Sequence, residues 1–325
     1  MTLKVSWKKA ARFALHDMGG LAVLRRRHRR EFGVLMFHAF GRDTDANMEA
    51  ICSHITRHFE PVSLSRIVDA IEGRATLPDN AITVTVDDGY RNFLHGHAIL
   101  KKHKVPATIY AVAGFAAGQL WLWPDQVEFG LKNSPLSALR VTLLSGTMDL
   151  PLDTPEARAA ALTHLLDVLK ETPNDERKAF MKSFGALCGV DIPAAPPPGQ
   201  EALTGDELRA LSADGVEIGC HTETHPILSR VQHPDELKRE IAGAKQHLEE
   251  QTGVPIRHFC YPNGRAIDIN SDVLRLVGEA GYQSAVTCTW GLNTVQAERF
   301  QIRRVPFDSR VDLGYGVELM AGLHM

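Results

Sequence analysis

Two short apolar segments of this chain are each followed at once by side chains that can bind a metal ion or move a proton. The segments span residues 82–86 and 216–220, and the side chains after them are Asp87, Asp88, His221 and His225. Carboxylates and imidazoles suit a divalent metal ion, and a set of this size leaves coordination positions open for water and substrate. The pattern is typical of a metal-assisted hydrolase.

The two histidines are four residues apart, which is the spacing that zinc proteases place on one face of a helix. Here Glu223 is at the third position of the motif instead of the second, Pro226 follows the second histidine at once, and an apolar strand precedes the first. A tight loop after a strand fits these residues better than a helix does. Such a loop can still turn both imidazoles inward.

The two aspartates are adjacent, so at the end of a strand their side chains point in different directions. Asp87 or Asp88 can therefore bind a metal ion while the other faces the reacting water. Gly89 then allows the backbone to turn sharply. A turn or a helix N-cap would explain one carboxylate, but it does not explain two beside a histidine pair.

Strands and helices that could position these side chains alternate along the sequence. Seven continuous apolar segments indicate strands covered on both faces, as in parallel sheets. They span residues 34–37, 82–86, 107–112, 216–220, 256–261, 284–288 and 302–305. Helical patterns lie between most of them, which predicts parallel βαβ units in a barrel or an open α/β sheet. In such folds the active site gathers at the carboxyl ends of the strands.

The expected organisation is an N-terminal segment followed by one large domain with an insertion. Residues 1–31 hold an amphipathic helical pattern and a basic stretch, and residues 32–325 form the α/β domain. The alternation is interrupted at about 118–200, where helical patterns near 155–169 and 175–187 predict a mainly helical insertion packed on the barrel.

The net charge and the cysteine content limit the kinds of partner and of structural site that we expect for this protein. The net charge of −3 favours no particular partner, and we expect no nucleic acid. The five cysteines are odd in number and widely spaced, which argues against a disulfide framework or a structural zinc site.

No membrane-spanning segment and no cleavable signal peptide is legible in the sequence. We therefore expect the protein in the cytoplasm, or peripherally at the membrane through its N-terminal helix. The oligomeric state is left open.

Several ordered segments resemble the NodB-like polysaccharide deacetylases of carbohydrate esterase family four, in the branch of the poly-N-acetylglucosamine deacetylases. Residues 85–90 (TVDDGY) resemble the first motif of that family, and residues 221–226 (HTETHP) resemble the second. Residues 259–264 (FCYPNG) are similar to the third motif as it occurs in one branch. Residues 34–38 and 304–306 resemble the first and last strands of that branch.

The resemblance implies a distorted (β/α) barrel of about seven parallel strands that binds one divalent metal ion, usually zinc, with cobalt or nickel as alternatives. Carried over residue by residue, Asp88, His221 and His225 are the metal ligands and Asp87 is the catalytic base. The implied reaction is attack of water on an acetamide carbonyl while Asp87 accepts the proton. Its products are acetate and a free amino sugar.

The remaining site positions are expected around this set. The third motif lacks the arginine that orients the base in many family members, and Arg303 or Arg304 could supply that charge. Arg304 is preferred because it matches the R-[IV]-P pattern of the branch, with a surface ion pair as the alternative. His38 is the candidate for a fourth site histidine, as general acid or in contact with substrate. The backbone N–H of Tyr261 is expected to hold the oxyanion. Aromatic candidates for stacking on sugar rings are Tyr90, Trp121, Trp123, Tyr261 and Trp290.

Three functional hypotheses follow. The first is a metal-dependent hydrolase that removes N-acetyl groups from a glycan, either an N-acetylhexosamine polymer or its precursor. The second keeps the fold and metal but deformylates or deacylates a lipid-linked or small amino sugar. The third is a glycan-binding module with a weakened catalytic site. Acetate release from N-acetylglucosamine oligomers separates the first from the other two.

Overall fold

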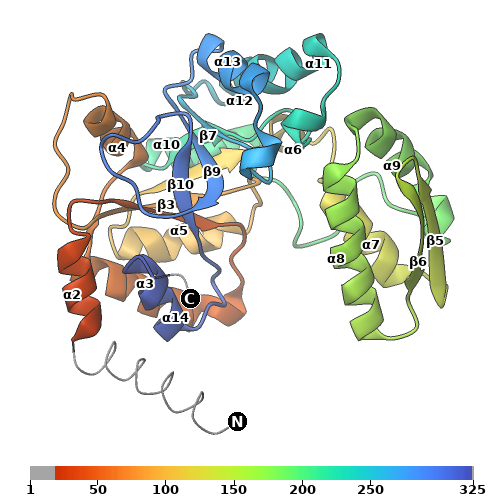
Figure 1. The fold of residues 1–325 in the computed structure, drawn as a ribbon, viewed down its shortest axis with the longest axis horizontal. Coiled ribbons are helices and arrows are strands. Elements are labelled where there is room, and N and C mark those ends of the chain that lie inside the picture. The colour runs from red at the N-terminus through yellow and green to blue at the C-terminus, as the bar shows by residue number, and fades with distance from the viewer. Residues whose placement is uncertain (1–18, 324–325) are drawn as a thin grey trace, which may run out of the picture.

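Seven parallel strands form a closed barrel in the computed structural model, which describes residues 19–323 (Figure 1). They are β1 (Gly33–Phe37), β3 (Ala81–Val86), β4 (Ala107–Ala111), β7 (Glu217–Cys220), β8 (His258–Cys260), β9 (Ser284–Trp290) and β10 (Ile302–Pro306). Their order is β1-β10-β9-β8-β7-β4-β3, and the pairing of β3 with β1 closes the ring. A short strand, β2 (Glu60–Pro61), adds to the outer side of β3. The predicted barrel of seven strands is confirmed.

The barrel strands are buried on both faces, which explains why their sequences are continuously apolar. Every residue of β1, β3 and β4 is buried. Because side chains alternate along a strand, Leu35 and Ile109 pack outward with the helices, whereas Val34 and Tyr110 belong to a separate inner cluster. The same alternation decides which polar side chains at the strand ends point into the barrel.

Helices cover the outer face of the barrel and bury their apolar sides against it. They are α2 (Gly20–Arg27), α3 (Asp45–His58), α5 (Phe93–Lys102), α6 (Ala113–Ala116), α10 (Gly205–Ala213), α11 (Pro234–Lys238), α12 (Ala244–Thr252), α13 (Ser271–Glu279) and α14 (Leu313–Met320). The remaining helix of the barrel domain, α4 (Leu64–Ile71), packs instead on the inner cluster that contains Val34 and Tyr110. A π-helical turn, η3 (Arg239–Gly243), joins α11 to α12. Single 3₁₀ turns are η1 (Arg42–Thr44), η2 (Leu228–Arg230) and η4 (Ala266–Asp268). Local signals set several helix starts, such as the capping box of Thr204 and Glu207 before α10.

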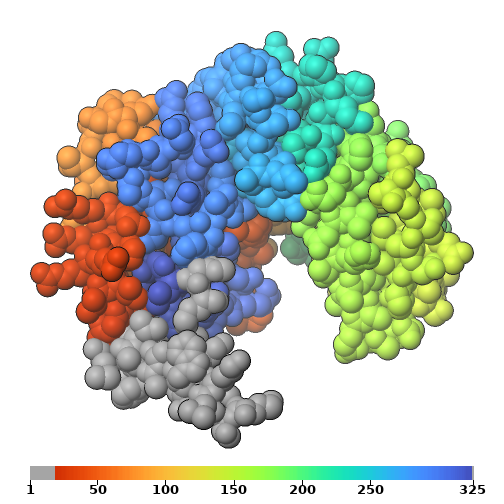
Figure 2. Space-filling model, viewed as in Figure 1, coloured from red at the N-terminus to blue at the C-terminus, as the bar shows by residue number. Residues whose placement is uncertain are grey.

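The connection from β4 to β7 contains the insertion, which projects from one side of the barrel (Figures 1 and 2). Its elements are α7 (Trp123–Asn133), β5 (Ala138–Leu143), β6 (Gly146–Pro151), α8 (Pro155–Glu171) and α9 (Asn174–Cys188). Helices α8 and α9 match the two predicted helical patterns, whereas α7 and the antiparallel hairpin of β5 and β6 were not predicted. Its signal is present in β5, where exposed and buried residues alternate. The insertion has an apolar cluster of its own.

The N-terminal prediction falls largely on residues 1–18, which lie outside the described part of the chain. Within that part, α2 carries Arg25, Arg26 and Arg27 in its last turn and buries Leu21. Among residues 19–323, no helix combines the length and the apolar character needed to cross a membrane.

Candidate active site

The two aspartates and the first histidine leave the barrel at the same edge, because the strand pairing continues one residue past β3 and β7. The N–H of Asp87 donates to the carbonyl of Phe37 at 2.8 Å, and the N–H of His221 donates to the carbonyl of Ala111 at 2.8 Å. These bonds fix the first residue of each motif at the carboxyl end of its strand, where α/β barrels place their active sites.

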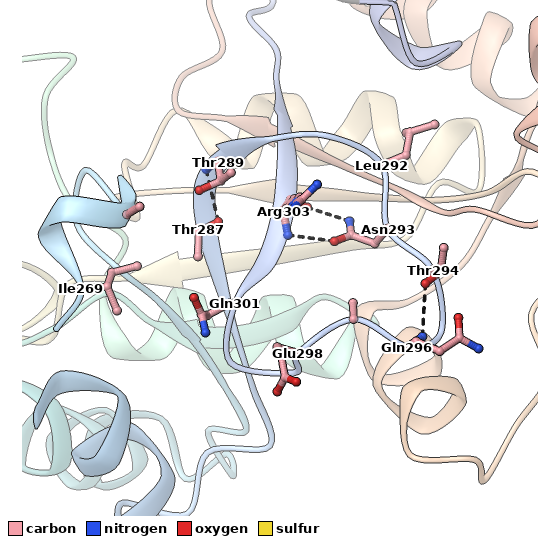
Figure 3. Close-up of a pocket in the computed structure, with 12 residues that line it drawn as sticks. Ile269, Thr287, Thr289, Leu292, Asn293, Thr294, Gln296, Glu298, Gln301 and Arg303 are labelled. Carbon is pink, nitrogen blue, oxygen red and sulfur yellow. Dashed lines mark hydrogen bonds between the residues drawn. The ribbon is translucent and has the colours of Figure 1, made fainter. Parts of the chain in front are cut away.

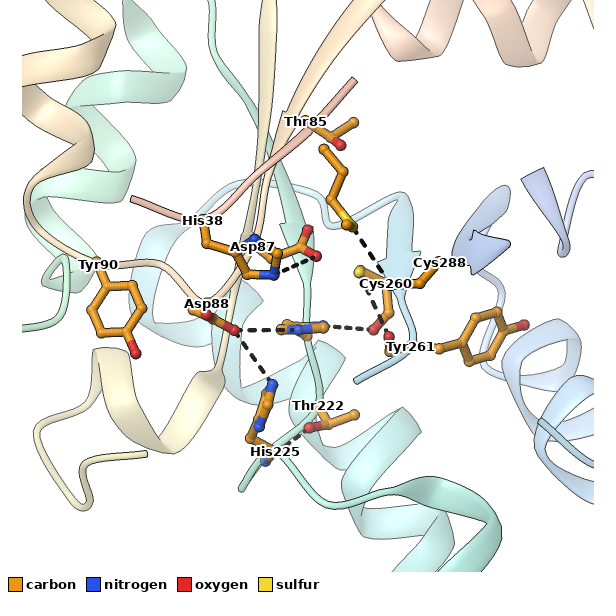
Figure 4. Close-up of polar contacts among 12 residues, drawn as sticks. His38, Thr85, Asp87, Asp88, Tyr90, Thr222, His225, Cys260, Tyr261 and Cys288 are labelled. Carbon is orange, nitrogen blue, oxygen red and sulfur yellow. Dashed lines mark hydrogen bonds and ion pairs between the residues drawn. The ribbon is translucent and has the colours of Figure 1, made fainter. Parts of the chain in front are cut away.

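Asp88 and the two histidines converge on one point (Figure 4). Oδ1 of Asp88 lies 3.5 Å from Nε2 of His221 and 3.3 Å from Nε2 of His225. Two atoms that bind one zinc ion tetrahedrally at about 2.0–2.1 Å are separated by about 3.3 Å, so this spacing fits a shared divalent metal ion. These three residues form one of the groups in the described chain that could hold a metal.

The ring of His221 is oriented by the third motif. Its Nδ1 lies 2.8 Å from the carbonyl oxygen of Cys260, at the end of β8, and both residues are buried. A proton on Nδ1 that donates to this carbonyl leaves the lone pair of Nε2 facing Asp88. Metal-binding histidines are commonly held in this way.

Backbone strain is concentrated in the three motifs. Six non-glycine residues of the described chain have a positive φ, and four of these lie in the motifs: Asp88 at 73°, Thr222 at 70°, His225 at 60° and Asn263 at 58°. The left-handed region disfavours side chains with a Cβ atom, most of all β-branched threonine. Such conformations persist where surrounding contacts enforce them, and they cluster at functional sites.

A buried carboxylate enforces the conformation of the histidine loop, residues 221–226. Glu240 accepts hydrogen bonds from the backbone N–H groups of Glu223 at 3.1 Å and Thr224 at 2.9 Å, and from the Thr224 hydroxyl at 2.7 Å. Glu240 lies in the π-helical turn η3, and π turns frequently occur at functional sites. The role of Glu240 is not visible in the sequence, because acidic side chains in a helical pattern indicate a solvated face.

The second aspartate of the pair, Asp87, is held by an arginine inside the barrel. Nη1 and Nη2 of Arg304 donate to its two carboxylate oxygens at 2.7 and 2.8 Å, and Arg304 also donates to the Thr287 carbonyl at 2.9 Å. Both side chains are buried, at 0% exposure for Arg304 and 2% for Asp87. Burial by itself would raise the pKa of Asp87, but the guanidinium charge outweighs burial and lowers that pKa below its usual value. The surface ion pair considered for Arg304 is therefore not what the structure contains.

His38 lies beside this pair, on the loop after β1. Its Nε2 is 3.8 Å from Oδ2 of Asp87, and its side chain is 51% exposed (Figure 4). This position leaves the imidazole accessible to a substrate that approaches the two aspartates.

Tyr261, whose N–H is the predicted oxyanion donor, directly follows β8. Its N–H donates to the carbonyl of Val286 at 3.4 Å, and its hydroxyl donates to the carbonyl of Phe300 at 3.0 Å. Its ring is buried in the outer core and points away from the aspartates and histidines (Figure 4). The oxyanion role of the Tyr261 N–H stays a prediction, whereas its ring does not line the site.

Tyr90 and Trp290 both lie at the edge of the barrel that carries the site. The hydroxyl of Tyr90 donates to Oδ2 of Asp125 at 2.7 Å. Trp290 is the last residue of β9, is half-buried, and pairs with Arg304 of β10. Asp125 comes from the first turn of α7, and no local pattern in the sequence distinguishes it from other acidic residues at helix starts. Burial raises the pKa of Asp125 to about 7, although the hydrogen bond from Tyr90 opposes this rise.

A separate cavity of about 490 Å³ lies on the outer side of β9 and β10 (Figure 3). Arg303, Thr287 and Thr289 contribute to its lining. Arg303 follows the alternation of β10, so it points away from the barrel interior that Arg304 occupies. None of the aspartates or histidines of the site lines this cavity.

Comparisons with known proteins agree with this fold. Residues 155–285 match the polysaccharide deacetylase family, a range that includes the second and third motifs. No curated protein sequence matched the chain. The predicted resemblance to the polysaccharide deacetylases is confirmed over this range of residues. The expected class of enzyme, an N-deacetylase that hydrolyses carbon–nitrogen bonds other than peptide bonds, agrees with this family.

Solved structures of low sequence identity share the fold. The Streptococcus pyogenes deacetylase PplD, in complex with acetate, is 14% identical with a TM-score of 0.57, over 89% of this chain and 98% of that one. A de-N-acetylase from Aggregatibacter actinomycetemcomitans is 16% identical with a TM-score of 0.54, over 89% and 99%. IcaB from Ammonifex degensii is 14% identical with a TM-score of 0.54, over 90% and 97%.

Proposed function

We propose that this protein removes N-acetyl groups from a glycan of N-acetylhexosamine units, with a divalent metal ion held by Asp88, His221 and His225. The observation that carries the proposal is the convergence of two sets of side chains at one edge of the barrel. One set has the spacing of metal ligands, and the other is a carboxylate held by a buried arginine. Zinc suits two imidazoles and one carboxylate best.

The chain's own residues support hydrolysis of an amide. The metal, when bound, supplies a Lewis acid that polarises the amide carbonyl and increases the acidity of water. Asp87 is kept ionised by Arg304, so it can accept the proton of the attacking water. His38, 3.8 Å from Asp87 and half exposed, is the group we assign to protonate the leaving nitrogen. Cleavage of the C–N bond then gives acetate and an amine.

The choice of an acetylated glycan draws on the family match and on relatives of similar fold, which include a de-N-acetylase and a deacetylase that holds acetate. The intact pair of Asp87 and Arg304 argues against a purely glycan-binding module, because such a module gains nothing from a buried, oriented carboxylate beside a metal site. We find no feature that favours a lipid-linked or small amino sugar over a polymer.

The test is acetate release from N-acetylglucosamine oligomers by the zinc-loaded protein. We expect release by the wild-type protein and loss of release in Asp87→Asn, with N-acetylglucosamine monomer as the comparison substrate. A protein that binds zinc but releases no acetate from any oligomer would contradict the proposed reaction. Release from the monomer alone would reject a polymer as the substrate.

A further inference from the structure

We propose that the insertion is part of the metal centre, and that Trp123 is a positioning residue for His225. This inference rests on the proposed function, because it assigns a role toward the metal that His225 would bind. Trp123 is the first residue of α7, and its indole N–H donates to the backbone carbonyl of His225 at 2.9 Å. The indole is buried, so water does not compete for this bond.

The carbonyl of His225 is held by the insertion, whereas the rest of the histidine loop is held from within the barrel domain. The carbonyls of Thr222 and Glu223 accept from the N–H groups of Ala113 and Gly114 at 3.0 Å each, at the start of α6. Glu240 binds the N–H groups that follow. A left-handed residue such as His225 needs contacts on its own peptide groups to keep its side chain aimed.

The two ends of the His225 backbone are fixed by different partners. Its N–H donates to the hydroxyl of Thr222 at 3.0 Å, within the loop, and its carbonyl accepts from Trp123. Its ring atom Nδ1 is buried and has no partner among the described residues. Because none of residues 19–323 binds Nδ1 of His225 as Cys260 binds that of His221, the backbone contacts must set the direction of the His225 ring.

Trp123 is itself held in place by the insertion. The guanidinium of Arg177, on α9, lies 4.8 Å from the centre of the indole ring and is buried. Arg177 donates to the side chain of Asn174 at 2.6 Å, and Asn174 donates to Glu236 of α11 at 2.9 Å. The helical stretch that contains Glu236 continues into the π turn that carries Glu240. Trp123 and Glu240 therefore hold the histidine loop from two sides, and the two residues are linked to each other through the contacts of α9 with α11.

Helix α7, which carries Trp123, also contacts the loop that follows β3 and contains Asp88. Asp125, two residues after Trp123, accepts a hydrogen bond from the hydroxyl of Tyr90. Tyr90 lies two residues after Asp88. The first turn of α7 thus bridges the loops that supply Asp88 and His225. We infer that the insertion fixes the distance between these two ligands.

The experiment compares Trp123→Phe with Trp121→Phe. Phenylalanine keeps a ring under Arg177 and removes the indole N–H, while Trp121 is a buried tryptophan of the same segment that packs on Phe129. Zinc affinity is measured by competition with a chromophoric chelator, and the visible spectrum of the cobalt-loaded protein reports ligand geometry. We expect W123F to bind zinc about 10- to 100-fold more weakly than W121F, with an altered cobalt spectrum.

The melting temperatures of the metal-free variants separate positioning from packing. Equal melting temperatures with weaker zinc binding in W123F support the proposal. Equal zinc affinity and cobalt spectra in W123F and W121F would overturn it. If W123F does not fold, Arg177→Lys keeps the charge but loses the planar stack, and unchanged zinc affinity in that variant overturns the proposal as well. A wild-type protein that binds no divalent metal contradicts the proposed function itself.

Discussion

Asp87 and Asp88 are chemically identical neighbours that the backbone places in different environments. Asp87 continues the inward face of β3 and meets Arg304, whereas Asp88 has a left-handed conformation and turns toward the histidines. Gly89 follows with φ of 81°, and a Cβ atom there would lie 3.1 Å from the Cα of Ala111. The turn therefore needs glycine both for its conformation and for its close approach to β4.

Neutralising the two aspartates one at a time should show that Asp87 is needed for catalysis and Asp88 for metal binding. We expect Asp87→Asn to retain zinc and to lose about 10²- to 10⁴-fold in kcat, because it removes the base. Asp88→Asn should lose zinc, because a carboxylate ligand becomes a weaker amide. Metal content by atomic spectroscopy and acetate release are the measurements. Full turnover in Asp87→Asn would reject its assignment as the base.

Removing the arginine partner should move the pH dependence of the reaction. In Arg304→Gln the burial of Asp87 is no longer offset, so its pKa rises and the acidic limb of kcat/KM shifts to higher pH. The variant should also lose about 3–5 kcal/mol of stability, because a buried charge loses its partner. Arg304→Lys keeps a positive charge and should show the smaller shift. An acidic limb that stays in place in both variants would contradict this role for Arg304.

At the scale of elements, the histidine loop depends on an irregular helix. The π turn η3 lies between α11 and α12 and carries Glu240, which is 2% exposed and binds the loop three times. Burial of a carboxylate destabilises a protein unless the carboxylate accepts hydrogen bonds, and here the N–H groups of the strained histidine loop donate them. The helix and the loop therefore stabilise each other's unusual conformations.

Glu240→Gln tests this dependence with little change in size. The amide presents one acceptor oxygen and an NH₂ group that opposes the loop N–H groups, so we expect about 10- to 100-fold weaker zinc binding. Glu250→Gln, an exposed position on α12, is the matched control and should bind zinc like the wild-type protein. Isothermal titration of both variants with zinc provides the comparison. Equal affinities would show that the loop keeps its shape without Glu240.

At the scale of the whole molecule, charged side chains join the insertion to the barrel domain. Glu171 at the end of α8 pairs with Arg230 and Arg265, and Lys178 of α9 pairs with Glu236 at 2.8 Å. Most of these side chains are partly exposed, so salt weakens their attraction. The buried contacts of Trp123 and Asn174 are the part of this junction that solvent does not screen.

Metal binding should stabilise the folded protein as a whole, because the ligands come from loops that are brought together only by folding. A metal at 100 times its Kd contributes about 2.7 kcal/mol, which corresponds to a rise in Tm of several degrees for a chain of this size. We expect zinc to raise the Tm of the wild-type protein, a chelator to reverse the rise, and His221→Ala to show neither effect. An identical rise in His221→Ala would place the stabilising metal elsewhere.

Much of the barrel could be predicted from the sequence, because parallel strands buried on both faces are continuously apolar and can be located one at a time. All seven predicted segments are strands, with ends that differ by at most two residues. The hairpin of β5 and β6 was missed, although Leu139, Val141 and Leu143 alternate with exposed residues. That alternation is short, and it lies in a segment where helical patterns are stronger.

The sequence by itself determined the strands and the chemistry of the four motif residues, because these depend on neighbours in the chain. Tertiary structure decided the rest: that Arg304 faces Asp87 inside the barrel, that the Tyr261 ring packs in the outer core, and that Glu240 and Trp123 hold the histidine loop. Each of these contacts joins segments whose relative position is set by barrel closure and helix packing. No local pattern of apolar and polar residues records such positions.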